Sequence, residues 1–172
     1  MHEGHEEVAG VSAEPATFDD LFRDHYAGMV RSLTVAGGDR ELAADCVQDA
    51  FTRAYVRWRR ISRYDDPAGW VRHVALNRMR DHWRRNKRRD RAVDRLGAQL
   101  EDVAPPTEPV SEPGLAAAVA DLPPRQREAV ALFYVEGLSV REVADSMKVS
   151  EGAVKYHLHE GRGRLRDALE RT

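Results

Sequence analysis

Arginines, aromatic rings and an amide are gathered around one stretch in the first half of the chain. Positions 78–95 hold nine basic residues and only three acidic ones. Arginine neutralises phosphates, while aromatic rings and amides can contact the bases of an unpaired strand. The candidate residues of such a single-stranded DNA site are Arg63, Tyr64, Asn77, Arg78, Arg80, Arg84 and Arg85. In the alternative interpretation, Trp70 and Trp83 are core residues and the arginines form a solvated face.

A second polar set lies near the end of the chain. Ser150 can cap a helix in which Val154, Leu158, Gly161 and Leu165 share the inner face. A short helix and a tight turn precede it, which is the pattern of a helix-turn-helix whose second helix reads base edges in the major groove. The candidate duplex-binding residues are Ser150, Glu151, Lys155, Tyr156, His159 and Arg162. A helical hairpin with a solvated face is the alternative.

Two helices open the first block, residues 18–95. Thr17 can cap the first, whose apolar residues repeat at three and four until Gly37 and Gly38 stop it. Asp39 can cap the second, which is expected to reach Trp58. Its polar residues lie largely off the apolar stripe and are Glu41, Asp45, Gln48, Asp49 and Arg53.

A third helix carries most of the candidate single-strand site. Asp66 followed by Pro67 is an N-cap with proline at the first helical position. The pattern predicts that this helix ends within positions 86–89.

The second block, residues 114–172, is also helical by its pattern. Short helices are expected over 115–122 and 125–136, the latter stopped by Gly137. Ser139 and Glu142 form a capping box that opens the next helix. The chain therefore reads as all-α, with two small helical domains.

The last helix-turn-helix has two local weaknesses. Lys148 stands in the turn, and a left-handed backbone there would cost a non-glycine residue roughly 1 kcal/mol or more. Gly161 and Gly163 each weaken the final helix by about 1 kcal/mol relative to alanine. We expect that helix to fray before Arg164.

Composition limits the other possibilities. The 172 residues are 42% hydrophobic and 33% charged, as in soluble helix-rich proteins, and no apolar run is long enough for a membrane span. The single cysteine, Cys46, can make no internal disulfide and is expected in the core. His2 and His5 lie in an acidic tail, residues 1–17, without further ligands. No metal, cofactor, catalytic residue or small-molecule substrate is expected, and the expected compartment is the cytoplasm.

The two blocks are joined by residues 96–113, which contain acids and prolines but no base. Such a segment stays extended and flexible. An inert spacer is one interpretation of it.

Two stretches of this chain resemble bacterial sigma factors. Residues 39–85 contain DRELAADCVQDAFTRAYVRW and DDPAGWVRHVALNRMRDHWRR, which resemble region 2. Residues 121–169 contain DLPPRQREAVALFYVEGLSVREVADSMKVSEGAVKYHLHEGRGRLRDAL, which is similar to region 4. With only these two regions and a short linker, the chain resembles the extracytoplasmic-function (ECF) group.

The resemblance implies a partner for each polar set. The second helix would bind the clamp of core RNA polymerase through Asp45, Gln48, Asp49 and Arg53. The basic loop and third helix would handle the melted -10 element of promoter DNA, and the last helix would read the -35 duplex. The acidic linker would mimic RNA phosphates in the polymerase channel, and an anti-sigma protein is a further possible partner.

The resulting interpretation is a promoter-specificity subunit of RNA polymerase, not itself an enzyme. A one-component repressor with a helix-turn-helix and an N-terminal sensor or dimerisation domain is the alternative. Against it, the first block has clustered arginines and aromatics where a ligand pocket or dimer seam would be expected. An RNA-binding adaptor would leave the second block unexplained.

Overall fold

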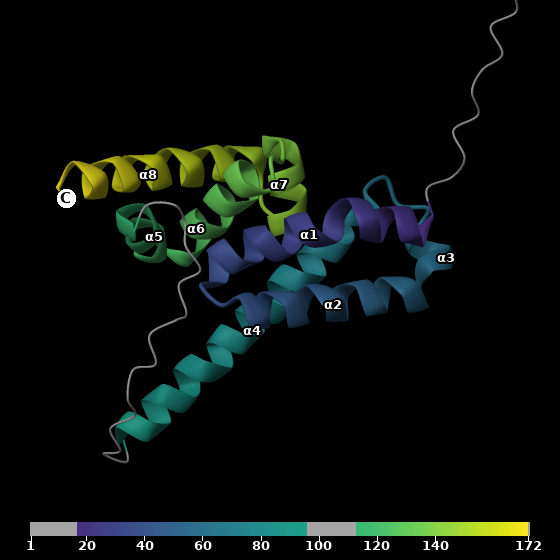
Figure 1. Ribbon diagram of the computed structural model, residues 1–172, viewed down its shortest axis with the longest axis horizontal. Coiled ribbons are helices and arrows are strands. Elements are labelled where there is room, and N and C mark those ends of the chain that lie inside the picture. The colour runs from purple at the N-terminus through teal and green to yellow at the C-terminus, as the bar shows by residue number, and fades with distance from the viewer. Residues whose placement is uncertain (1–16, 96–112, 172) are drawn as a thin grey trace, which may run out of the picture.

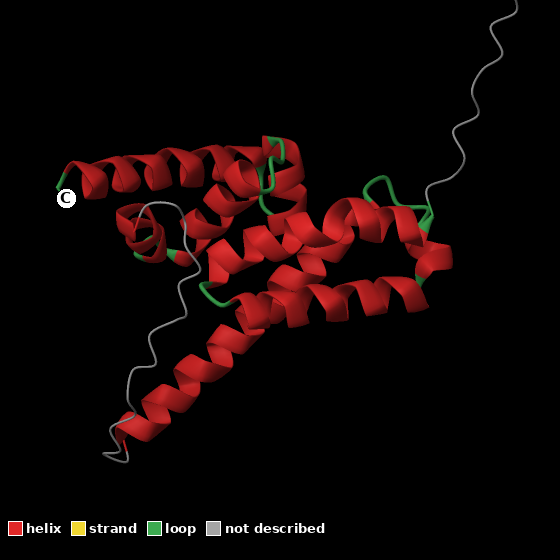
Figure 2. Cartoon of the chain, viewed as in Figure 1, coloured by secondary structure: helices red, strands yellow, loops and turns green. Residues whose placement is uncertain are grey.

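The computed structural model describes residues 17–95 and 113–171, and every regular element in these ranges is a helix (Figures 1 and 2). The all-α prediction is confirmed for this part of the chain. The expectations for the acidic tail, with His2 and His5, and for positions 96–112 of the predicted linker lie outside the described residues. The last residue of that linker, Pro113, instead begins a helix.

The first block contains four helices, and its predicted N-caps are present. The helices are α1 (Phe18–Gly37), α2 (Arg40–Val56), α3 (Trp58–Ile61) and α4 (Pro67–Arg95). The side chains of Thr17, Asp39 and Asp66 each accept a hydrogen bond from the backbone N–H three residues further on. The second helix, expected to reach Trp58, ends at Val56 instead, and Trp58 begins the short α3.

The long helix α4 corrects one prediction. The sequence pattern placed its end at 86–89, but the helix continues to Arg95. Arginine and lysine are good helix formers, and no glycine or proline interrupts the segment. Asn86 also contacts His82 one turn back, at 3.0 Å between Nδ2 and Nε2. The arginine-rich half of α4 consequently projects away from the other helices (Figure 1).

The second block contains five helical elements. They are α5 (Pro113–Ala120), α6 (Pro124–Val130), η1 (Ala131–Val135), α7 (Val140–Met147) and α8 (Glu151–Glu170). The single helix expected over 125–136 is α6 followed by η1, a π-helical turn in which Glu136 N bonds Ala131 O at 3.3 Å. A π turn inserts extra backbone and shifts the phase of the residues after it. The position of Glu136 therefore does not follow from α-helical periodicity.

Three residues with positive φ end helices where the sequence predicted stops or turns. Gly38 has φ 74°, Gly137 has φ 78° and Lys148 has φ 55°. Lys148 adopts the left-handed conformation that a glycine would adopt more easily. The turn between α7 and α8 is thus retained despite the lysine.

Helix α8 continues through Gly161 and Gly163 to Glu170, so the prediction that it frays before Arg164 is wrong. Gly161 is buried where α8 crosses α6. A Cβ atom at this position would lie 3.0 Å from Val130 Cγ2 and 3.7 Å from Gln126 Cβ. The missing side chain allows the two helices to approach closely, and this packing offsets the low helix propensity of glycine.

Alanine substitution of Gly161 and of Gly163 should have different effects on stability. No atom lies within 4 Å of a Cβ built at Gly163. Gly163→Ala should therefore raise the free energy of unfolding by about 0.5–1 kcal/mol. Gly161→Ala gains the same propensity but crowds Val130, so it should stabilise less or destabilise. Thermal unfolding followed by circular dichroism compares them, and an equal gain in both variants would contradict the packing role of Gly161.

The two blocks lie against each other, with α1 next to α6 and η1, and α7 next to α4 (Figure 1). Their buried side chains form one continuous apolar cluster, which includes Met29 of α1, Leu132 of η1 and Met147 of α7. Cys46 is buried in this cluster, as expected. Trp70 and Trp83 are partly buried against it, which favours their interpretation as core residues.

Candidate functional site

The outer face of α8 is exposed along its first three turns. Val154 and Leu158 are buried on the opposite face. Ser150 caps the helix, its Oγ accepting from Ala153 N at 3.1 Å. The exposed candidate residues are Glu151, Lys155, Tyr156, His159 and Arg162. A rigid helix with one polar face is what insertion into a major groove requires.

Tyr134 is a neighbour of this face that sequence reasoning missed. It lies in η1 with more than half of its surface exposed, and Arg162 Nη1 donates to its hydroxyl at 3.4 Å. The two residues are 28 positions apart, so no local pattern connects them. The contact restrains Arg162 at the C-terminal end of the polar set.

The candidate single-strand set is divided by the structure. Arg63 and Tyr64 are exposed in the turn before α4, and so are three arginines along the helix, namely Arg78, Arg84 and Arg85. Asn77 and Arg80 are only partly exposed and face the second block. Arg80 Nη1 donates to Asn77 Oδ1 at 3.1 Å, and Arg80 Nε donates to Glu128 Oε1 at 2.8 Å.

His73 connects Asn77 to α7. The backbone oxygen of Ser146 can only accept, so His73 Nδ1 donates to it at 3.0 Å. His73 Nε2 then accepts from Asn77 Nδ2 at 2.9 Å. Burial lowers the pKa of His73, and the charges of Lys148 and Arg80 act in the same direction, against the bond to Ser146. The neutral imidazole required by this chain of hydrogen bonds is therefore favoured near pH 7.

The candidate polymerase-binding residues lie together on α2. Asp45, Gln48 and Arg53 are exposed, and Asp49 is half-buried. Asp49 Oδ2 lies 2.8 Å from Arg53 Nε and 3.2 Å from Arg78 Nε. Asp49 thus connects the candidate polymerase-binding face to α4, and substituting it affects both.

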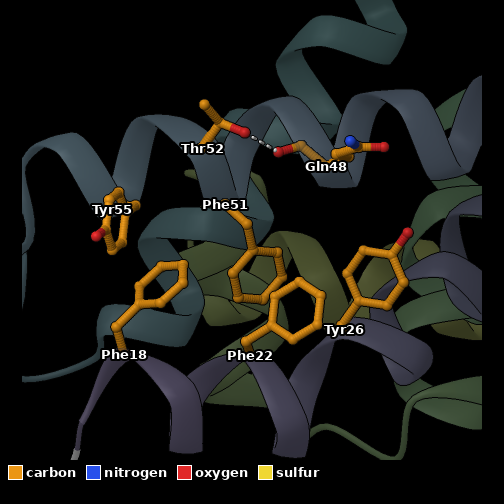
Figure 3. Close-up of a pocket in the computed structure, with 7 residues that line it drawn as sticks. All are labelled: Phe18, Phe22, Tyr26, Gln48, Phe51, Thr52 and Tyr55. Carbon is orange, nitrogen blue, oxygen red and sulfur yellow. Dashed lines mark hydrogen bonds between the residues drawn. The ribbon is translucent and has the colours of Figure 1, made fainter.

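Beside these residues lies an aromatic groove between α1 and α2 (Figure 3). Its volume is about 490 Å³. Phe51 forms the base, with its ring centroid 5.0 Å from that of Phe22, and Tyr55 lies at one end, 5.1 Å from Phe18. The lining residues, which we call the aromatic groove, are Phe18, Phe22, Tyr26, Gln48, Phe51, Thr52 and Tyr55.

Sequence reasoning missed this groove, although a signal for it exists. Phe18, Phe22 and Tyr26 recur every four residues, and so do Phe51 and Tyr55. Side chains four apart share one helix face. The pattern therefore indicates two aromatic faces, but not that they meet with space left between them.

Other kinds of chemistry find little support in the described residues. Across 17–95 and 113–171, no three His, Cys, Asp or Glu side chains are grouped to hold a metal ion. None of the described helices combines the length and apolar character needed to cross a bilayer. Burial raises the pKa of the Cys46 thiol, which keeps it protonated and unreactive.

Comparison with known families matches both blocks. Residues 20–89 match the model of sigma-70 region 2, and residues 114–165 match that of sigma-70 region 4. The two matches occur in the order predicted. They contain the exposed face of α8, the polar face of α2 and the basic part of α4 as far as position 89.

Curated relatives extend the likeness over most of the chain. The RNA polymerase sigma-E factor of Streptomyces antibioticus is 31% identical over 159 residues, 91% of this chain and 87% of that protein. The ECF RNA polymerase sigma factor SigM of Bacillus subtilis is 30% identical over 160 residues, 90% of this chain and 96% of that protein. SigE of Mycolicibacterium smegmatis is 31% identical over 176 residues, but the chain spans only 65% of that relative's length.

Two solved structures have the same fold. The sigma factor RpoE from Bartonella quintana, in complex with the anti-sigma factor NepR, has a TM-score of 0.73 at 20% identity, covering 89% of this chain and 96% of that one. CnrH, in complex with the cytosolic domain of CnrY, has a TM-score of 0.60 at 23% identity, covering 89% and 87%. With regions 2 and 4 in order and relatives at this identity over nearly their whole length, the chain belongs to the ECF RNA polymerase sigma factors.

Proposed function

We propose that three faces of this sigma factor divide the work of promoter recognition. The polar face of α2 with the aromatic groove binds core RNA polymerase, the basic face of α4 with the preceding turn binds the melted -10 strand, and the outer face of α8 reads the -35 duplex. Sigma factors direct polymerase to promoters and are initiation factors rather than enzymes. This chain accordingly acts without catalysing a reaction.

The single observation that carries this proposal is the exposed polar face of α8. The helix that carries this face follows the left-handed turn at Lys148, and its opposite face is buried through Val154 and Leu158. A helix held in this way can present Glu151 and Lys155 to base edges while its inner face stays packed. That arrangement supports duplex reading by the second block.

The aromatic groove supports the polymerase-binding role of α2. Exposed aromatic rings beside a polar rim are the usual composition of strong protein-binding sites. Tyr55 is exposed at one end of the groove, and Gln48 lines it. A helical partner could place apolar side chains between the rings and hydrogen-bond to Gln48 and Asp45.

The basic face of α4 supports binding of the melted strand. Arg78, Arg84 and Arg85 are exposed there, and Arg63 and Tyr64 lie in the turn before the helix. Guanidinium groups suit phosphates, and Tyr64 offers a ring for an unstacked base. Such a surface can bind a single strand without reading the base sequence of a duplex. In this proposal α8 reads the duplex.

The proposed compartment of this chain is the cytoplasm, and its proposed regulator is an anti-sigma protein. Transcription takes place in the cytoplasm, where we place this chain. Two solved structures with the same fold are complexes with a second protein, and in one of them that protein is named an anti-sigma factor. We include an anti-sigma protein among the partners of this chain on that support.

Run-off transcription with purified core RNA polymerase tests the function. The chain with core should initiate at discrete start sites on sheared genomic DNA, and neither component should do so alone. A one-component repressor would instead bind a specific duplex without polymerase and yield no start sites. The promoters found in this way supply the -10 and -35 sequences for the experiments below.

Asn77→Ala should specifically impair melting. The loss of one base contact costs about 1–3 kcal/mol, so open-complex formation on a duplex promoter should fall roughly 10- to 100-fold. Binding of holoenzyme to a fragment with only the -35 element should stay unchanged. Asn86→Ala is the matched control, because Asn86 is an exposed asparagine further along the same helix. Equal losses on both DNA fragments would contradict the -10 role.

A further inference from the structure

Tyr134 lies in the π turn of η1, next to the polar face of α8. The backbone bond from Glu136 N to Ala131 O spans one residue more than an α-helical bond. Within this turn Leu132 is buried, whereas Tyr134 is 53% exposed. Single π turns inside helices occur frequently at functional sites. The turn thus keeps its inner side packed in the core while its tyrosine faces solvent.

Two contacts fix the orientation of the Tyr134 side chain. The ring of Phe133, which is partly buried against the apolar cluster, lies edge-on to it with centroids 4.9 Å apart and an interplanar angle of 80°. This is a favoured geometry for two aromatic rings. At the other end, the hydroxyl accepts from Arg162 Nη1 at 3.4 Å. The hydroxyl of Tyr134 is therefore placed beside α8, although the residue belongs to another helix.

Both groups have hydrogen-bond donors left over. A phenolic hydroxyl can accept one bond and still donate its own proton, and a guanidinium carries five N–H donors. Among the residues that the structure describes, the Tyr134 hydroxyl is the one acceptor bonded to Arg162, and no carboxylate neutralises this arginine. Arg80 differs, because its guanidinium is bonded to Glu128. Tyr134 and Arg162 consequently present unused donors and a positive charge at the surface.

The spacing of these donors suits a phosphate. Charge-assisted hydrogen bonds to phosphate oxygens are ~2.7–2.9 Å long. Two donor atoms 3.4 Å apart can therefore both contact oxygens of a single phosphate. The guanidinium supplies the charge, and the bond that the hydroxyl accepts from it makes the hydroxyl a better donor. Contacts of this kind fix the register of a protein on duplex DNA without reading bases.

We propose that Tyr134 and Arg162 form a phosphate pair, which binds one backbone phosphate of the -35 duplex beside the groove that α8 enters. The inference rests on the proposed -35 role of α8. It adds a contact from outside the recognition helix, since Tyr134 belongs to η1. A phosphate held from two helices fixes how far along the groove Glu151 and Lys155 are placed.

The first test removes only the hydroxyl. Tyr134→Phe keeps the ring, so the melting temperature should stay unchanged. Binding of the holoenzyme to a duplex that carries only the -35 element should weaken about threefold to tenfold, the effect of one hydrogen bond. The salt dependence should keep its slope, because the hydroxyl is uncharged. Arg162→Ala should instead reduce that slope by about one.

The second test locates the phosphate. Each phosphate of the -35 duplex is replaced in turn by an uncharged methylphosphonate, and the affinity of the holoenzyme is measured. At one position the loss of affinity seen with the wild type should disappear in Arg162→Ala and shrink in Tyr134→Phe. Because both groups bind the same phosphate, adding Tyr134→Phe to Arg162→Ala should cost less than about twofold.

Arg166→Ala is the matched control. Arg166 is an exposed arginine one turn beyond Arg162 on α8. Its removal takes away the same charge without removing the partner of Tyr134. The effects of Arg166→Ala and Tyr134→Phe should therefore multiply in the double variant, as expected for independent sites.

The outcomes separate the phosphate pair from the function on which it rests. If the wild-type holoenzyme binds the -35 duplex no better than a scrambled one, the -35 role fails and the pair fails with it. If that preference stands but Tyr134→Phe binds as tightly as the wild type, only the pair is overturned. Effects of Tyr134→Phe and Arg162→Ala that multiply would also overturn it, and so would a changed -35 consensus in Tyr134→Phe.

Discussion

Phe51→Ala should lower the free energy of unfolding by about 3–5 kcal/mol, as expected when a buried phenylalanine is truncated. Phe51 is only 2% exposed and contacts the rings of Phe18, Phe22 and Tyr26. Its removal leaves a cavity between α1 and α2 and breaks three ring contacts at once. A domain with a stability of 5–15 kcal/mol would lose a large fraction of it. Thermal unfolding measures the change.

Tyr55→Ala should have little effect on stability but should weaken the binding of core polymerase. Tyr55 is 67% exposed and contacts one ring, that of Phe18, so the loss of stability should be about 1 kcal/mol or less. As an anchor for the polymerase clamp, its loss should weaken core binding about tenfold or more. Fluorescence anisotropy of labelled chain titrated with core measures this affinity.

Val56→Ala is the control for both variants, because Val56 is exposed at the end of α2 outside the aromatic groove. It should change neither the melting temperature nor the affinity. Unchanged core binding in Tyr55→Ala would remove the groove from the proposed polymerase interface. An unchanged melting temperature in Phe51→Ala would contradict the packing described here.

The second large effect concerns the -35 element. We expect Glu151 and Lys155 to contact bases and Arg162 to contact the phosphates of the DNA backbone. Glu151 lies in the first turn of α8, where it can accept from cytosine N4, and Lys155 is one turn further on the same face. Losing either base contact should cost about 1–3 kcal/mol and relax preference at one promoter position.

Arg162 should behave differently because it lies two turns beyond Lys155 along α8, where its guanidinium donates to the Tyr134 hydroxyl. Arg162→Ala should weaken binding to all sequences alike and flatten the salt dependence. Selection from randomised -35 sequences, with holoenzyme containing each alanine variant, compares the three. An unchanged consensus for the Glu151 and Lys155 variants would refute base reading, and a consensus altered by Arg162→Ala would refute the backbone role.

The sequence by itself determined where the capped helices begin and which of their faces are apolar. Thr17, Asp39, Ser139 and Ser150 cap helices as predicted, because a cap depends on residues three positions apart. The exposed face of α8 also followed from sequence, since the period of a helix separates Lys155 from Val154 without any other element. Motif resemblance then identified the family, which the comparisons bear out.

Sequence was less reliable wherever distant packing opposed a local preference. Gly161 looked like a weak point in α8, but it is where α8 meets Val130 of α6. Glu136 looked like the end of an ordinary helix, but a π turn precedes it. At Gly161 the contact with another helix outweighs a propensity of about 1 kcal/mol or less.

Only the tertiary structure decided which of the candidate DNA-binding residues are accessible. Arg78 and Arg80 are two positions apart on one basic helix, yet Arg78 stays exposed beside Asp49 while Arg80 is mostly buried against Glu128, 48 positions away. The pair of Arg72 and Glu136 spans 64 positions. A charged residue has the same local pattern whether it faces water or a partner on another helix. Its burial is set by which helices pack together, because an ion pair excludes water only once both sides of the contact are in place.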